Sequence, residues 1–247
     1  MIRKTLWFME RLLKSYNGIG YNANSSSIFL YLNFNRNKGE EFMDELMKIM
    51  IPQNLENMQL PSPELLTYYR NLEDRVIWID YGVDETILEV SKLIMYFNKL
   101  DKNIPIEERK PIKLLLYSYG GDGQACFSLL DIIALSKTPV WTINMGVAMS
   151  AGLLILLAGH KRFCLKNSTA LAHSGSGGTC GTYEQTEAQM KDYQRFVKTM
   201  RDYIIERTDI DAKTLNKYKS KEWYLYSEEQ TKYRVVDKVI DDIDEIL

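Results

Sequence analysis

Residues 113–159 read KLLLYSYGGDGQACFSLLDIIALSKTPVWTINMGVAMSAGLLILLAG, and this stretch decides the fold. It contains two apolar runs typical of buried strands, KLLLYS (113–118) and VWTINM (core 141–145), and each is followed by an apolar helix pattern. An order of strand, helix, strand, helix with short links implies parallel strands joined by right-handed crossovers. The sequence therefore predicts an α/β fold.

The same alternation continues on both sides of this stretch. Upstream, RVIWID (75–80) is predicted to be a buried strand, and TILEVSKLIMYF is predicted to be an amphipathic helix. Downstream, RFCL and TALAH are predicted to be two more short strands. After the glycine-rich SGSGGTCG (174–181) we expect a long helix over about 184–207. The rest is predicted as a short helix, a strand WYLY, a helix starting at Ser227 and a final VVDKVI.

The predicted long helix has an apolar stripe along one side. The stripe consists of Met190, Tyr193, Phe196, Val197, Met200, Tyr203 and Ile204. It has little of its own chain left to cover, so we expect it to form an interface.

Residues 1–60 are predicted to be a region of their own. They contain a helix pattern at the start, a strand-like IFLYLNF and a second helix pattern, EEFMDELMKIM. Pro61 and Pro63 in PSPELL mark the boundary, and Ser62 is a candidate cap for a short helix. We therefore expect a second region over 61–247.

Charge and cysteine content exclude several classes of protein. The net charge is −2, and the Lys and Arg residues are scattered, so we expect neither nucleic acid nor a membrane surface as a partner. The 3 cysteines include no C-x-x-C pair, which disfavours a disulfide framework or a zinc site. Glu10 and Arg11 interrupt any signal peptide, and Leu153 to Ala158 is too short to span a bilayer. We expect a cytoplasmic protein without a metal or a cofactor.

The chain has 2 histidines, which makes the search for a general base short. His160 follows an apolar helix in a polar turn and is expected to be a surface residue. His173 ends the apolar strand TALAH just before glycines, where it is either a structural histidine or a base. Ser150 in GVAMSAG stands between a strand and a helix, where it is either a helix cap or a nucleophile.

Gly120 and Gly121 follow the strand 113–118. They form either a tight turn or a turn that leaves a backbone amide free for an oxyanion. Because open α/β sheets place their sites at the carboxyl ends of strands, this turn is expected beside Ser150.

The ordered blocks SYGGDG, GVAMSAGLLILLAG and KRFCLKNSTALAH resemble those of the Clp protease proteolytic subunit family. The resemblance covers about residues 70–240. It implies the α/β spiral that Clp peptidases share with crotonases, with a handle helix projecting at 184–207. A ClpP-like serine peptidase domain would span 61–247, and residues 1–60 differ from the N-terminal pore loops of the family.

The resemblance also implies catalytic roles. Ser150 would attack the peptide carbonyl, and His173 would take its proton and give it to the leaving amine. The amides of Gly121 and Ala151 would form the oxyanion hole.

The third member of the triad follows from alignment on YRVVD (233–237). Counting back places Glu222 where the family has an aspartate, and a glutamate can orient a histidine in the same way. Glu222 is otherwise a solvated loop residue, and Asp209 and Asp211 are the other candidates. Three further departures from the family pattern are Tyr119, Gly175 and Arg234.

By the same resemblance, the chain would be an ATP-dependent-type serine endopeptidase that forms stacked heptameric rings. Its substrates would be unfolded polypeptides, and its possible partner is a Clp ATPase chaperone. Two alternatives stay open. One is an inactive or regulatory ring subunit, and the other is a crotonase-like acyl-CoA enzyme that uses the same two backbone amides.

Overall fold

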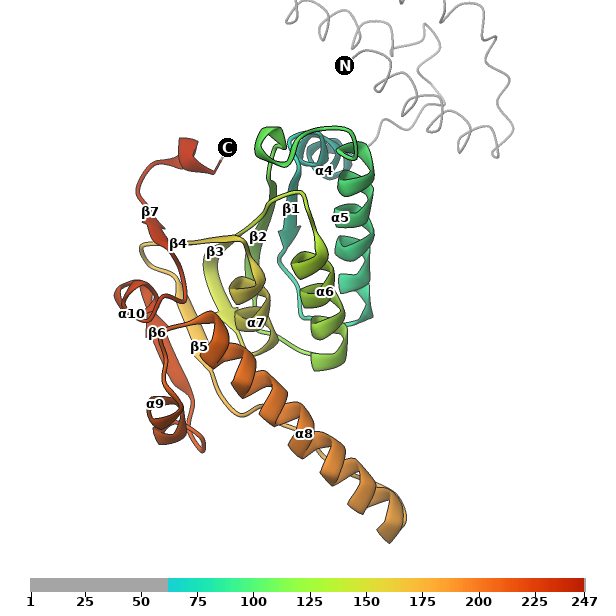
Figure 1. The fold of residues 1–247 in the computed structure, drawn as a ribbon, viewed down its shortest axis with the longest axis vertical. Coiled ribbons are helices and arrows are strands. Elements are labelled where there is room, and N and C mark those ends of the chain that lie inside the picture. The colour runs from blue at the N-terminus through green and yellow to red at the C-terminus, as the bar shows by residue number, and fades with distance from the viewer. Residues whose placement is uncertain (1–61, 247) are drawn as a thin grey trace, which may run out of the picture. The chain divides into compact units, whose positions relative to one another are not determined.

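The computed structural model describes residues 62–246, which Figure 1 draws as a coloured ribbon. The elements predicted within residues 1–60 lie outside the described residues. The first described element is helix α4 (Pro63–Glu73). The side chain of Ser62 caps it and accepts a hydrogen bond from the amide of Leu65 at 3.3 Å. The prediction that Ser62 caps a short helix is confirmed.

Strands and helices alternate along the described chain, as the sequence predicts. In order, the remaining elements are β1 (Val76–Ile79), η2 (Glu85–Ile87), α5 (Leu88–Leu100), η3 (Ile106–Glu108), β2 (Ile112–Ser118), α6 (Gly123–Leu135), β3 (Val140–Met149), α7 (Ala151–Ala158), β4 (Lys161–Leu165), β5 (Thr169–Ala172), α8 (Tyr183–Arg207), α9 (Ala212–Lys217), β6 (Trp223–Tyr226), α10 (Ser227–Lys232), β7 (Lys238–Ile240) and η4 (Ile243–Glu245).

Within residues 62–246 the strands form one mostly parallel sheet. Strands β1, β2, β3, β4 and β7 lie side by side in this order, and every pair is parallel. Strand β5 pairs in parallel with β3, and β6 pairs with β5 in antiparallel orientation. The predicted α/β architecture is confirmed.

Strand β3 pairs with two different strands along its length. Its first part pairs with β4, from Trp141 to Asn144. Its second part pairs with β5, from Val147 to Met149. We call this division the fork. The predicted core of this strand, 141–145, lies within β3, and pairing with β5 extends the strand to Met149.

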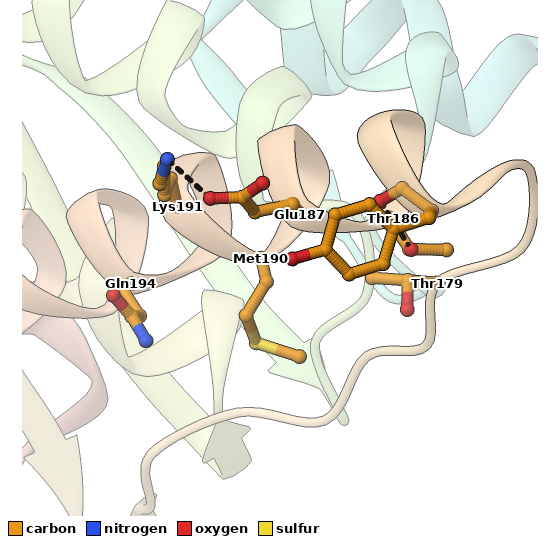
Figure 2. Close-up of a pocket in the computed structure, with 7 residues that line it drawn as sticks. Thr179, Thr186, Glu187, Met190, Lys191 and Gln194 are labelled. Carbon is orange, nitrogen blue, oxygen red and sulfur yellow. Dashed lines mark hydrogen bonds and ion pairs between the residues drawn. The ribbon is translucent and has the colours of Figure 1, made fainter.

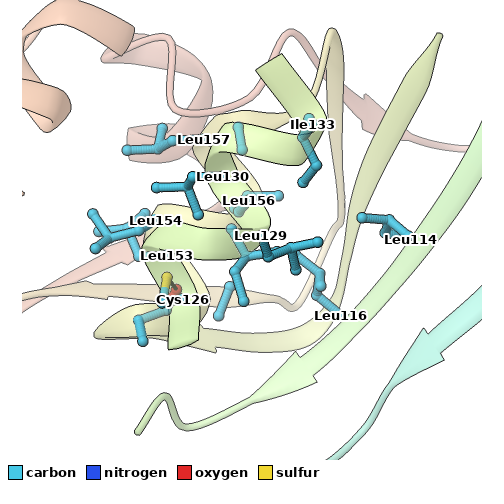
Figure 3. Close-up of a cluster of buried hydrophobic side chains, with 14 of the residues drawn as sticks. Leu114, Leu116, Cys126, Leu129, Leu130, Ile133, Leu153, Leu154, Leu156 and Leu157 are labelled. Carbon is cyan, nitrogen blue, oxygen red and sulfur yellow. Dashed lines mark hydrogen bonds between the residues drawn. The ribbon is translucent and has the colours of Figure 1, made fainter. Parts of the chain in front are cut away.

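Helices α6 and α7 pack together against the sheet, and Figure 3 shows their leucines meeting over β2. Every residue of α7 is buried, since the helix contacts β3, α6 and α8. Fully burying one leucine contributes about 1.5–3 kcal/mol. The core therefore fixes α7, and with it the backbone that precedes Ala151.

Helix α8 corrects one prediction. In Figure 1 it extends away from the sheet, and Met190 near its start is 47% exposed. The second half, however, packs on its own chain. Met200 and Ile204 are buried in the core, and the ring of Phe196 lies against that of Phe127. The expectation that the stripe has little of its own chain to cover was wrong for this half.

Candidate active site

Ser150 lies in the sharp turn between β3 and α7. Its backbone has φ 55° and ψ −120°, in a region that residues other than glycine rarely adopt. The amide of Ser150 donates a hydrogen bond to the carbonyl of Leu171 on β5 at 3.1 Å. A buried helix on one side and a paired strand on the other therefore hold this strained turn in place.

His173 directly follows β5, and the fork brings it to Ser150. Because β5 pairs with the second part of β3, the ends of the two strands lie together. The Nε2 atom of His173 is 2.7 Å from the Oγ atom of Ser150. His173 is half-buried, so its ring combines one fixed contact with access to solvent. This is the spacing at which an imidazole accepts a proton from a hydroxyl.

The glycine turn after β2 packs against Ser150. Gly120 has φ 92°, and a Cβ atom there would lie 2.7 Å from the Cβ atom of Ser150. The carbonyl of Gly120 accepts from the amide of Val83, and the amide of Asp122 donates to the carbonyl of Val83. This pairing leaves the amide of Gly121 unused, and Gly121 is exposed.

Ala151 is the first residue of α7, so its amide has no partner within the helix. The same imagined Cβ atom on Gly120 would lie 2.9 Å from the nitrogen of Ala151. Behind the turn, the thiol of Cys126 donates to the carbonyl of Ala151 at 3.4 Å. Burial raises the pKa of Cys126 to about 12, so this group stays a neutral thiol. The amides of Gly121 and Ala151 thus belong to two turns that pack against each other.

Glu222 lies next to the strand pair β5–β6. Ala172 pairs with Trp223, so the next pair in this antiparallel register would be His173 and Glu222. However, the carboxylate Oε2 of Glu222 accepts a hydrogen bond from the hydroxyl of Tyr224 at 2.5 Å. Within residues 62–246 no hydrogen bond joins His173 to Glu222. The register ends one pair before these two residues, and their side chains are not joined.

The two other candidate acids have partners of their own. Asp209 forms an ion pair with Arg234 at 3.0 Å, and both side chains are exposed. Asp211 caps α9 by accepting from the amide of Thr214. Each carboxylate is therefore used in local structure.

Comparison with known proteins decides the family. Residues 62–242 match the family model described as Clp protease. The chain belongs to the Clp protease family. The proteolytic subunit of the ATP-dependent Clp protease from Deinococcus radiodurans is 30% identical over 199 residues, which are 80% of this chain and 95% of that protein.

Two further relatives agree with this family. Proteolytic subunit 1 of the ATP-dependent Clp protease from Bacillus cereus is 29% identical over 193 residues, 77% of this chain and 97% of that protein. Proteolytic subunit 2 from Treponema denticola is 34% identical over 132 residues, 53% of this chain and 66% of that protein. The chain is accordingly a Clp-type serine endopeptidase, and the crotonase-like alternative has no support from these relatives.

A buried network of polar side chains joins β3 to α10 and to the start of β5 in this Clp fold. Asn144 on β3 donates to the carbonyl of Thr169 and to the side chain of Gln230 on α10. Gln230 in turn donates to the carbonyls of Ser168 and Leu225. Both side chains are fully buried. Sequence reasoning missed this network. Asn144 within the otherwise apolar β3 was a visible signal, whereas Gln230 lies in the polar sequence SEEQTK and gave none.

His160 has a structural role in this Clp chain. Its side chain is exposed, as predicted, but its Nδ1 accepts a hydrogen bond from the amide of Val140 at 2.8 Å. Partial desolvation of the ring by its neighbours, together with the charge of Arg207, lowers the pKa of His160. The histidine therefore anchors the start of β3 in its neutral form.

Figure 2 shows a hollow on α8, lined by residues between Thr179 and Gln194. It contains neither Ser150 nor His173, so it is distinct from the contact between these two residues. No group of three or more His, Cys, Asp or Glu residues suited to a metal occurs in the described range. None of the helices described is long and apolar enough to cross a membrane.

Proposed function

We propose that Ser150, His173 and Glu222 form the catalytic triad of this Clp-type serine endopeptidase, with the amides of Gly121 and Ala151 as its oxyanion hole. The observation that carries the proposal is the 2.7 Å contact between Nε2 of His173 and Oγ of Ser150. The strained backbone of Ser150 supports it, because such strain collects at functional sites.

The chemistry follows from these positions. Oγ of Ser150 attacks the peptide carbonyl while Nε2 of His173 takes its proton. The carbonyl oxygen becomes an oxyanion, and the amides of Gly121 and Ala151 donate hydrogen bonds to it. His173 then gives the proton to the leaving amine. In the second half of the reaction His173 takes a proton from water, the water oxygen attacks the acyl carbon, and His173 returns the proton to Oγ of Ser150 as the acyl–serine bond breaks.

Glu222 completes the triad when its carboxylate accepts from Nδ1 of His173. The extrapolated strand register supports this role, since directly opposed residues have Cβ atoms about 4.5–5.5 Å apart. A carboxylate there fixes the ring orientation and stabilises the imidazolium that forms during attack. The contact with Tyr224 has to break or be shared for this to happen.

We extend the proposal to assembly and partners. The domain over 61–247 would form stacked heptameric rings that enclose the sites, and residues 1–60 would be a separate N-terminal region. The exposed first half of α8 supports an interface there, and the names of the relatives, which begin with ATP-dependent, support a Clp ATPase partner. The substrates would be unfolded polypeptides in the cytoplasm.

A fluorophosphonate probe tests the nucleophile. The full-length protein should be labelled at Ser150, labelling should disappear in Ser150→Ala, and it should fall by about 10²-fold or more in His173→Ala. Ser128→Ala is the matched control, because this exposed serine on α6 bonds to its own helix and should label as wild type.

Two outcomes contradict the proposal. Undiminished labelling in Ser150→Ala would place the nucleophile elsewhere. A wild-type protein that forms rings, yet neither labels nor hydrolyses peptides, would favour the inactive ring subunit. The bond between Glu222 and Tyr224 is the observation that favours this second candidate.

A further inference from the structure

Strand β6 has one buried face and one exposed face. Trp223 and Leu225 point into the core and are buried. Tyr224 is 44% exposed and lies on the opposite face, which also bears Glu222 two residues earlier. Glu222 and Tyr224 are therefore neighbours along the same edge of the site.

The hydroxyl of Tyr224 donates to Oε2 of Glu222 at 2.5 Å. The hydrogen bond to Glu222 is the largest of the effects that raise the pKa of Tyr224; slight burial and the neighbouring Tyr226 add to it. The phenol thus stays protonated, and stays a donor, at any pH where a serine peptidase works.

Glu222 has two possible partners and one side chain. The strand register, continued by one pair, sets it opposite His173, and its hydrogen bond joins it to Tyr224. A glutamate has one methylene more than an aspartate, so its carboxylate can turn toward either neighbour. In the structure the carboxylate is bonded to Tyr224, and Nε2 of His173 already contacts Ser150.

We propose that Tyr224 is a positioning residue whose hydroxyl holds the carboxylate of Glu222 out of hydrogen-bond contact with His173. The inference rests on the proposed triad, and it adds a competitor for the acid. Catalysis then includes a step in which Glu222 exchanges the phenol for the imidazole. This exchange raises the activation free energy of the reaction when the phenol is present, and it is not needed when the hydroxyl is removed.

Tyr224→Phe in the full-length protein tests this directly, because it removes the hydroxyl and keeps the ring. For a short fluorogenic peptide, kcat should rise about tenfold, the factor for one hydrogen bond to a charged group, with KM unchanged. The matched control is Tyr226→Phe, which removes the same group two residues farther along the same face. This control should leave both constants at their wild-type values.

A second arm separates positioning from a general structural effect. In a Glu222→Gln background the carboxylate is absent, so Tyr224→Phe should change kcat by less than twofold. An unchanged or lower kcat in Tyr224→Phe overturns the proposal, as does an equal gain in both backgrounds. Failure of the proposed function would give a different result, because fluorophosphonate labelling at Ser150 would then be absent from the wild-type protein and the variant alike.

Discussion

Gly120→Ala is the sharpest test of how the turn after β2 supports Ser150. The backbone φ of 92° is unfavourable for any residue with a side chain. The new Cβ atom would lie 2.6 Å from the carbonyl oxygen of Met149 and 2.9 Å from the nitrogen of Ala151. Both are backbone atoms of the residues on either side of Ser150, so relief of the overlap has to move the proposed site itself.

The magnitude follows from two contributions. A left-handed backbone costs a non-glycine residue about 1–2 kcal/mol. Inserting a methyl group into a packed region costs typically another 1–3 kcal/mol. Gly120→Ala should therefore lower the free energy of unfolding by about 3 kcal/mol. Displacing the hydroxyl of Ser150 by about 1 Å should slow acylation by about 10²-fold.

Urea unfolding and the rate of fluorophosphonate labelling measure these two effects. Gly178→Ala is the control, because a Cβ atom there has nothing within 4 Å. It should change stability by less than about 0.5 kcal/mol and leave labelling unchanged. If Gly120→Ala is as stable and as reactive as Gly178→Ala, the reasoning from backbone overlap is refuted.

Two further predictions concern buried polar groups. Gln230→Ala should cost about 3 kcal/mol in urea unfolding, because it leaves fully buried hydrogen-bonding groups without partners, whereas the exposed Gln194→Ala should change stability by less than about 0.5 kcal/mol. Burial opposes ionisation of Asp101, but hydrogen bonds from Arg75 and Thr138 outweigh it and hold the pKa of Asp101 below its ordinary value. The stability that this ion pair contributes is complete above the unfolded pKa of about 3.9 and is lost as the pH falls through the folded pKa. Asp101→Asn should therefore lower the free energy of unfolding by about 3 kcal/mol at pH 7 and by much less near pH 2. An equal loss at both pH values would contradict this.

Local patterns in the sequence were enough for most of the fold. The apolar runs before Ser118 and Ala172 gave strands, and the helix after Ser150 followed from its continuous apolar stretch. The length of β3 was not predictable in this way, because pairing with a later strand decides where it ends. The half of α8 near Met200 was misjudged for a related reason, since an apolar stripe does not specify what covers it.

In the candidate site, too, the residues could be named from the sequence, but one side-chain contact could not be predicted from it. Ser150 and His173 were named from the sequence, and the structure places their side chains in contact. The bond between Tyr224 and Glu222 was not predicted. Residues two apart on a strand share a face in any sequence, but which partner a flexible carboxylate chooses depends on rotamers and distances that appear with the folded chain.

The fork in β3 has a mechanical consequence. Ser150 follows the tip of β3 itself, whereas His173 lies on the branch that continues through β5 toward α8. The pairing that joins this branch to β3 is short and runs from Val147 with Thr169 to Met149 with Leu171. A displacement of β5 relative to β3 would therefore change the distance between Oγ of Ser150 and Nε2 of His173, whereas β4 pairs with the first part of β3 and is not joined to either residue.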